Sequence, residues 1–327
     1  MTYNIQTYAV IGAGNMGSGI AQKIATEGMP VVLVDLTDEQ VERGMGIIKT
    51  MLDQGVERRI FRPEQAEAIL ARITPTSNWN DLANVDLVIE AVFENLDVKK
   101  KVFSRLGEVC KPNAILGTNT SSFFVKDVAA ACSNPERVVG LHYFFHPAKN
   151  RLVEVIGHEL VDEKAMSAAW AAQEAIGKTP IHSADAPGFV VNRYFVPWLN
   201  EAVRLLDEGV ADVATIDWAA KKAFEIGMGP FELMNVTGVP IAMHAANTLG
   251  QELHAFYAPA PGLVHQVNEV KQDWVLSGTP DESKFDAIAS RLLGVTFYIA
   301  AKLVDEGVAS VNQLGDRKST RLNSSHS

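Results

Sequence analysis

The chain has 327 residues, of which 47% are hydrophobic and 21% charged, and its formal net charge is −10 at pH 7. This length exceeds one average domain, so two domains are expected, and the acidic balance argues against nucleic acid and anionic membranes as partners. The N-terminus has no basic segment followed by an apolar one, and no run of 18 apolar residues occurs, so neither a secretory leader nor a membrane span is expected.

Apolar runs and helical patterns alternate along the first half of the chain. Amphipathic stretches at 18–28 and 41–52 predict helices, and five short apolar runs predict buried strands at 8–11, 31–35, 86–91, 114–118 and 137–141. Buried strands separated by helices are typical of an α/β protein with a doubly wound, mostly parallel sheet. From about Asp185 the pattern changes to long helical segments rich in Ala and Leu, which predicts an all-α second domain.

A glycine motif lies between the first predicted strand and the first helix. It has the sequence Gly12-Ala-Gly14-Asn15-Met16-Gly17. In a dinucleotide-binding turn the first glycine forms the turn, the second lets the backbone approach a pyrophosphate, and the third allows close helix packing. Free amides at the helix start, around Asn15 and Met16, then hold the anion. The motif predicts a Rossmann-type domain.

An acidic residue follows at the end of the second predicted strand. Asp35 lies 18 residues after Gly17, and Leu36 and Thr37 come next, so no arginine follows it. A carboxylate at this place accepts from both ribose hydroxyls and repels a 2′-phosphate. The sequence therefore predicts NAD as the cofactor in preference to NADP.

A histidine and a carboxylate occur twelve residues apart in the apolar sequence that follows. Strand alternation puts Glu154 among apolar neighbours, where an ionised carboxylate needs a partner, and His142 is a candidate. Such a pair would orient the imidazole and leave one ring nitrogen to accept a proton from a substrate hydroxyl. Two alternatives stay open: a packed histidine beside an edge-strand glutamate, or a metal site formed with His146. The aromatic residues and Pro147 around His146 indicate a strand and loop, which disfavours the metal site.

Several motifs, in this order along the chain, resemble L-3-hydroxyacyl-CoA dehydrogenases between about Tyr8 and about Thr237. They are Val88-Ile-Glu-Ala-Val-Phe-Glu-Asn-Leu-Asp-Val-Lys99, Thr118-Asn-Thr-Ser-Ser122, Gly140-Leu-His142, Leu152-Val-Glu154-Val-Ile156, Asp185-Ala-Pro-Gly-Phe-Val-Val-Asn192-Arg193 and Met228-Gly-Pro-Phe-Glu-Leu233. The resemblance implies reversible NAD-dependent oxidation of a 3-hydroxyacyl-CoA to a 3-ketoacyl-CoA, in fatty-acid or short-chain acyl-CoA metabolism.

The resemblance also implies roles for single residues. His142 matches the family's general base, Glu154 the carboxylate that orients it, and Ser121 a serine that hydrogen-bonds the substrate oxygen. Asn192 matches an active-site asparagine at the start of the second domain. Three further positions match residues that line the NAD site: Glu94, Lys99 and Asn119.

The substrate side of the site is less regular. The family has two aromatic residues and then Asn-Pro after the histidine, whereas Phe145 and His146 precede the proline here, and His146 is a candidate replacement contact. For coenzyme A phosphates the best match by register is Arg58, within a basic cluster with Lys49, Arg59 and Arg62. A solvated helix face is the alternative for that cluster.

A repeat occupies the second half of the chain. Asn192–Thr215 and Ser290–Gln313, 98 residues apart, are identical at nine of 24 positions. It resembles the duplicated helical domain of some family members. From Asp316 the chain is polar and patternless, which predicts a disordered or foreign tail. The expected organisation is therefore a Rossmann domain at 1–184, a helical domain at 185–280, a truncated second copy at 281–315 and a tail at 316–327.

Partners and location complete the expectations. An apolar stripe in the second copy and its missing continuation predict a homodimer, with an acyl-CoA as the substrate. Two cysteines, Cys110 and Cys132, give neither a disulfide framework nor a metal spacing, which favours the cytoplasm. Two rival functions remain: a related hydroxy-acid dehydrogenase on the same scaffold, and a non-catalytic NAD-binding homologue.

Overall fold

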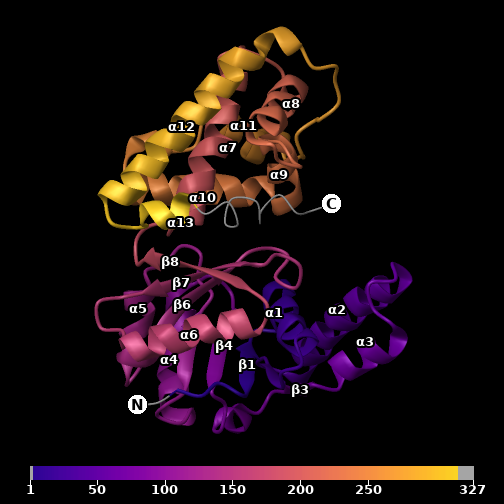
Figure 1. The fold of residues 1–327 in the computed structure, drawn as a ribbon, viewed down its shortest axis with the longest axis vertical. Coiled ribbons are helices and arrows are strands. Elements are labelled where there is room, and N and C mark those ends of the chain that lie inside the picture. Colours follow the sequence, from indigo (N-terminus) through magenta and orange to yellow (C-terminus); the bar gives the residue numbers. More distant parts are fainter. Residues whose placement is uncertain (1–2, 316–327) are drawn as a thin grey trace. The chain divides into compact units, whose positions relative to one another are not determined.

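The computed structural model describes residues 3–315 of the chain. The chain divides into two compact units, one ending at Asp185 and the other beginning at Ala186 (Figure 1). The first unit is a sheet flanked by helices and the second is helical, so the predicted fold class is confirmed. The predicted tail at 316–327 lies outside the described residues.

The first unit is built on an eight-stranded sheet with the order β3-β2-β1-β4-β5-β6-β7-β8. All neighbouring strands are parallel except β6 and β7, which run antiparallel. The order reverses between β1 and β4, as in a doubly wound sheet. The strands are β1 (Tyr8–Ile11), β2 (Val31–Val34), β3 (Ile73–Thr76), β4 (Leu87–Glu90), β5 (Ile115–Thr118), β6 (Val138–Tyr143), β7 (Leu152–Gly157) and β8 (Thr179–Ala184).

The two edge strands, β3 and β8, have no counterpart among the predicted strands. Strand β3 includes Pro75 and is half exposed, and β8 alternates between buried and accessible residues. An edge strand has one open side and tolerates proline and polar residues, so its sequence lacks the continuous apolar run of a central strand. The pattern that identified the inner strands therefore misses the edges.

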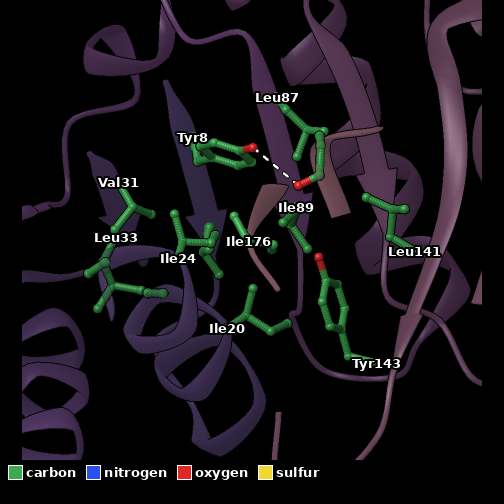
Figure 2. Packing of buried hydrophobic residues seen from close by; sticks show 14 of the residues in the cluster. Tyr8, Ile20, Ile24, Val31, Leu33, Leu87, Ile89, Leu141, Tyr143 and Ile176 are labelled. Carbon is green, nitrogen blue, oxygen red and sulfur yellow. Dashed lines mark hydrogen bonds between the residues drawn. The ribbon is translucent and has the colours of Figure 1, made fainter. Parts of the chain in front are cut away.

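Helices cover the sheet and bury its apolar side chains. In Figure 2 the side chains of Tyr8, Ile20, Ile24, Leu33 and Ile89 pack together between strands and helix α1, and they belong to the buried core of this unit. The helices are α1 (Asn15–Thr26), α2 (Asp38–Glu57), α3 (Pro63–Leu70), α4 (Leu96–Val109), α5 (Val125–Ala129) and α6 (Glu163–Ala175), with short 3-10 turns η1 (Trp79–Leu82) and η2 (Pro135–Arg137).

The second unit is a bundle of helices around its own core. Buried residues that include Trp198, Phe231 and Leu292 form that core, and helices α7 and α12 pack along each other. The elements are α7 (Val191–Asp207), α8 (Val213–Phe224), α9 (Pro230–Thr237), α10 (Val239–Glu252), η3 (Ala255–Tyr257), α11 (Pro261–His265), η4 (Gln266–Val270), η5 (Glu282–Lys284), α12 (Phe285–Asp305) and α13 (Val311–Gly315).

One stretch of the described residues, Glu282–Asp305, is long and apolar enough to cross a membrane by length and composition alone. Its residues Leu292, Ile299 and Leu303 are fully buried in the helical unit, whereas 33% of its apolar window as a whole is buried. Phe297, on another side of α12, is 69% exposed.

Candidate active site

The predicted site residues of the first unit gather at one edge of the sheet. The glycine motif follows β1, Asp35 follows β2, and the segments with Glu94 and Ser121 follow β4 and β5. These strands are parallel, so their carboxyl ends lie at the same edge, next to the point where the strand order reverses. In open α/β sheets ligands bind in the crevice at this point.

The glycine loop is shaped for close approach of a ligand. Gly12 has φ +101°, and a Cβ there would lie 2.5 Å from the carbonyl oxygen of Ala91. A Cβ on Gly17 would lie 1.7 Å from the oxygen of Gly12, so helix α1 can begin only where this residue has no side chain. At Gly14 an added Cβ would meet nothing within 4 Å. The open side of the loop at Gly14 therefore fits a pyrophosphate held by the amides of α1.

Asp35 is held by backbone amides at the end of β2. Its Oδ2 accepts a hydrogen bond from Ala13 N at 2.7 Å, and its Oδ1 accepts one from Leu36 N, also at 2.7 Å. The first bond fixes the carboxylate beside the glycine loop, and Leu36 next to it is 73% exposed. An anchored carboxylate at this place fits the ribose of NAD.

A buried ammonium joins two glutamates behind the site. The Lys99 side chain is 1% exposed, and its Nζ lies 2.8 Å from Glu90 Oε1 and 3.0 Å from Glu94 Oε2. Glu90 is fully buried and also accepts a hydrogen bond from Thr118 Oγ1 at 2.7 Å. Glu90 and Lys99 are both enclosed, and Glu94, whose side chain is 30% exposed, connects the ammonium to the surface.

Glu94 gathers the loop that follows β5. Its Oε1 accepts hydrogen bonds from the Thr120 hydroxyl at 2.7 Å, from Ser121 N at 2.9 Å, and from Ser122 N at 3.1 Å and Ser122 Oγ at 2.8 Å. Burial alone would raise the pKa of Glu94, but the Lys99 ammonium and the Thr120 and Ser122 hydroxyls together lower it. The ionised carboxylate therefore fixes the exposed Ser121 in place.

Asn119 links the ends of two neighbouring strands. Its Oδ1 accepts a hydrogen bond from Tyr143 N at 2.8 Å, directly after His142 on β6. The amide thus ties the segment after β5 to the strand that bears the histidine.

The histidine and glutamate expected to interact are in contact. The antiparallel register places His142 of β6 opposite Glu154 of β7, with Nδ1 of the imidazole 2.6 Å from Oε2 of the carboxylate. The histidine is 5% exposed and Glu154 is fully buried, and the Phe144 ring lies against the imidazole with centroids 4.5 Å apart. The contact with the carboxylate fixes the orientation of the imidazole ring.

A buried lysine supports the loop between these two strands. Lys178, 4% exposed, donates from Nζ to the carbonyl oxygens of Pro147 and, at 2.7 Å, of Asn150. Burial, reinforced by the charge of Lys23, lowers the pKa of Lys178 to about 7. The loop that connects His142 to Glu154 is therefore held from beneath by an amine.

His146 belongs to the same loop. Its Nδ1 accepts a hydrogen bond from Ala148 N at 3.2 Å, and the loop packs closely on α1, where a Cβ on Gly19 would lie 3.0 Å from His146 Cε1. The neighbouring Phe145 is 49% exposed. Within residues 3–315 no group of three or more His, Cys, Asp or Glu side chains is arranged so that it could hold a metal ion.

Two predicted residues belong to other elements of the chain. Arg58 is the C-terminal cap of α2, a helix of 20 residues and therefore about 30 Å long, which begins just after Asp35. It is exposed, as are Arg59 and Arg62. Asn192 lies in the first turn of α7, in the helical unit.

Sequence reasoning missed the residues that support the site from behind. Glu90 was a charged residue inside the apolar run of β4, and Lys178 preceded a strand that was not predicted. An ionisable residue within an apolar run indicates a buried pair. That signal could have found Glu90, but its partner Lys99 is fixed only by the packing of α4.

A doubly wound sheet with a glycine turn after β1 and a carboxylate after β2 defines an NAD-binding dehydrogenase of the Rossmann class. Residues 7–186 match the family model of the 3-hydroxyacyl-CoA dehydrogenase NAD binding domain, and residues 188–272 match that of the C-terminal domain. The chain belongs to the 3-hydroxyacyl-CoA dehydrogenase family, and the resemblance predicted from its sequence is confirmed. NAD is the cofactor that the first domain indicates.

Known relatives agree with this family. The chain is 41% identical over 244 residues to 3-hydroxyadipyl-CoA dehydrogenase of Escherichia coli, covering 73% of this chain and 50% of that protein. It is 36% identical over 244 residues to 3-hydroxybutyryl-CoA dehydrogenase of Clostridioides difficile, covering 75% and 87%. The crystal structure of (S)-3-hydroxybutyryl-CoA dehydrogenase from Ralstonia eutropha has a TM-score of 0.79 and 32% identity, covering 84% and 100%. The chain thus spans only half of the Escherichia coli relative.

The carboxylate of Asp35 should determine which cofactor the protein prefers. We expect NAD(H) to be preferred to NADP(H) by about tenfold or more, or about 1.4 kcal/mol, because a 2′-phosphate would be repelled. Fluorescence titrations with NADH and NADPH measure this preference, and Asp35→Ser should reduce it. Equal affinity of the wild type for both cofactors would contradict the assignment.

Lys178 should make stability depend on pH in the alkaline range. The unfolded lysine keeps its proton up to about its ordinary pKa of 10.5, whereas the folded one loses it near 7. Between these values the unfolded state binds more protons, so the free energy of unfolding should rise with pH relative to Lys178→Met. Urea unfolding at several pH values from 7 to 10 tests this, with Lys164→Met as an exposed control. Parallel curves for wild type and Lys178→Met would refute the effect.

Proposed function

We propose that this protein interconverts a 3-hydroxyacyl-CoA and the corresponding 3-ketoacyl-CoA with NAD(H), in fatty-acid or short-chain acyl-CoA metabolism. The observation that supports this most is the buried contact of 2.6 Å between His142 and Glu154, in the same unit as a loop that fits NAD. A fixed, carboxylate-paired imidazole is what removal of a hydroxyl proton needs.

In the oxidation direction, Nε2 of His142 accepts the proton of the substrate 3-hydroxyl group. Bound NAD supplies the acceptor for the hydride that leaves C3. Glu154, ionised and in contact with Nδ1, stabilises the imidazolium that results and keeps the ring in one orientation. In the reduction direction the same imidazolium returns its proton to the oxygen.

Four further side chains belong to the proposed site. The Ser121 hydroxyl, in a loop fixed by Glu94, donates to the substrate oxygen as its charge develops. Asn192 contributes an amide from the helical unit. Lys99 and Glu94 act together, because the ammonium holds the carboxylate that gathers the loop. Preorganised donors of this kind need no rearrangement during the reaction.

The acyl-CoA portion of the proposal depends on separate residues. Arg58 is an exposed cation at the end of α2 and would pair with a coenzyme A phosphate. His146 and Phe145 would line the acyl end in place of the asparagine of the family motif.

We place the protein in the cytoplasm, because both Cys110 and Cys132 are buried free thiols.

Turnover should depend on the histidine far more than cofactor binding does. With NADH and acetoacetyl-CoA as substrates, His142→Gln should lower kcat by about 10²–10⁴-fold while NADH affinity is retained, since a positioned acid or base contributes that much. Glu154→Gln should cause a smaller loss. His182→Gln, an exposed histidine on β8, should leave kcat unchanged.

Several outcomes of these assays would refute the proposal. High activity in His142→Gln would remove this residue from the mechanism. A wild-type protein that reduces free acetoacetate as well as acetoacetyl-CoA would indicate a related hydroxy-acid dehydrogenase. A protein that binds NADH and reduces neither substrate would be a non-catalytic homologue.

We also propose that the protein forms homodimers through exposed apolar residues of α12. Phe297 is 69% exposed and Tyr298 is 51% exposed on this helix, and exposed apolar groups of this kind favour association. Phe297→Glu should shift the mass measured by light scattering from dimer to monomer. Leu160→Glu, at a residue 61% exposed in the first unit, should leave it unchanged. A wild type that is monomeric at tens of micromolar would contradict the proposal.

A further inference from the structure

The two copies of the repeat fold alike. Helix α7 ends at Asp207 and α12 at Asp305, 98 residues later, and each is followed by a glutamate cap and a glycine with positive φ, 67° at Gly209 and 68° at Gly307. The closing hydrogen bonds also correspond, from Val210 N to Leu205 O at 3.0 Å in the first copy and from Val308 N to Leu303 O at 2.9 Å in the second. The shift of 98 residues therefore maps one helix end onto the other.

The same shift relates two ion pairs between the copies. Arg193 of α7 pairs with Glu306, the cap of α12, and Arg291 of α12 pairs with Glu208, the cap of α7, at 2.9 Å. Adding 98 to Arg193 gives Arg291, and adding 98 to Glu208 gives Glu306. Reciprocal contacts of this kind are the mark of two-fold symmetry, so the helices form an antiparallel pair inside one chain.

The symmetry is broken where the pairs meet their surroundings. Arg291 also donates from Nε to Glu201 at 2.7 Å, whereas the position equivalent to Glu201 in the second copy is the buried Ile299. The corresponding Nε of Arg193 is buried and has no hydrogen-bond partner among residues 3–315. Arg193 is 2% exposed, and among the carboxylates of residues 3–315 only that of Glu306 pairs with its buried guanidinium.

Glu306 is suited to this task. Burial would raise the pKa of its carboxyl, but Arg193 and Lys302 together hold it below its usual value, so it is ionised at neutral pH. Arg193 directly follows Asn192 in the first turn of α7, and its own N donates to Gly188 O at 3.1 Å. Whatever fixes Arg193 therefore fixes the backbone that orients Asn192.

We propose that Glu306, from the second copy of the repeat, is a positioning residue that holds Asn192 by neutralising the buried Arg193. The proposal rests on the proposed function, in which Asn192 contacts the substrate. The second copy of the repeat has Ser290 at the position of Asn192. The proposal nevertheless gives this copy a role in turnover. A small displacement of such a group lowers the rate without changing cofactor affinity.

The matched pair of charges provides the test. Glu306→Gln should lower kcat with NADH and acetoacetyl-CoA about tenfold or more, since misplacement by about 1 Å can cost 10²-fold, while the KM for NADH changes little. Glu208→Gln breaks the symmetric pair, but Arg291 keeps Glu201, so kcat should stay within about twofold of the wild type. Because Glu306 acts through Arg193, the double variant Arg193→Gln/Glu306→Gln should be no slower than Arg193→Gln alone.

Three results would overturn the inference. They are an unchanged kcat in Glu306→Gln, an equal loss in Glu208→Gln, and losses from Arg193→Gln and Glu306→Gln that multiply in the double variant. If the wild type does not turn over acyl-CoA, the proposed function fails by itself. The thermal midpoints of the wild type, Arg193→Gln, Glu306→Gln and the double variant then decide whether Arg193 and Glu306 are coupled. Additive changes in midpoint would then show that Arg193 and Glu306 are not coupled, and non-additive changes would support the proposed pairing of Arg193 with Glu306.

Discussion

The contact between His142 and Glu154 depends on the single antiparallel pairing in the sheet. Strands β6 and β7 run in opposite directions, and this brings two residues twelve positions apart to face each other across one rung of the ladder. A fully buried carboxylate without a partner would cost several kcal/mol, so the pair has to form if β7 is to be buried at all. Stability of the strand and orientation of the imidazole therefore have the same cause.

The charged residues behind the cofactor loop also compensate one another. The Lys99 ammonium lies between the carboxyl groups of Glu90 and Glu94 and forms an ion pair with each. The carboxylate of Glu94 then has lone pairs left for the hydroxyl and amide donors of the loop after β5. Each of these hydrogen bonds stabilises the negative charge of Glu94, and together they fix the loop that contains Ser121.

The helical unit solves a comparable problem by duplication. An amphipathic helix has to bury its apolar face, and α7 does so against a second copy of itself. The reciprocal ion pairs at the two ends fix the register of this antiparallel pair. The two ends are unequal because the first copy has Glu201 where the second has Ile299, so that in the described residues Arg291 pairs with two carboxylates and Arg193 with one.

The sequence by itself determined the features that arise from local chemistry. Glycines 12, 14 and 17 between a strand and a helix indicate a tight turn, Asp35 follows a strand at the spacing of a nucleotide site, and inner strands of a parallel sheet are apolar throughout. The alternation around Glu154 also predicted a buried carboxylate that needs a partner. The sequence did not predict the edge strands β3 and β8, because a strand with one exposed side lacks the continuous apolar pattern.

Only the tertiary structure decided which charges meet. Lys99 with Glu90, Lys178 with the carbonyl groups of the loop before β7, and Arg193 with Glu306 join residues separated by 9 to 113 positions in the chain. Residue type indicates that a buried charge requires compensation, but the identity of its partner depends on strand order and helix register. Those are properties of the packed core, and no single segment of the sequence specifies them.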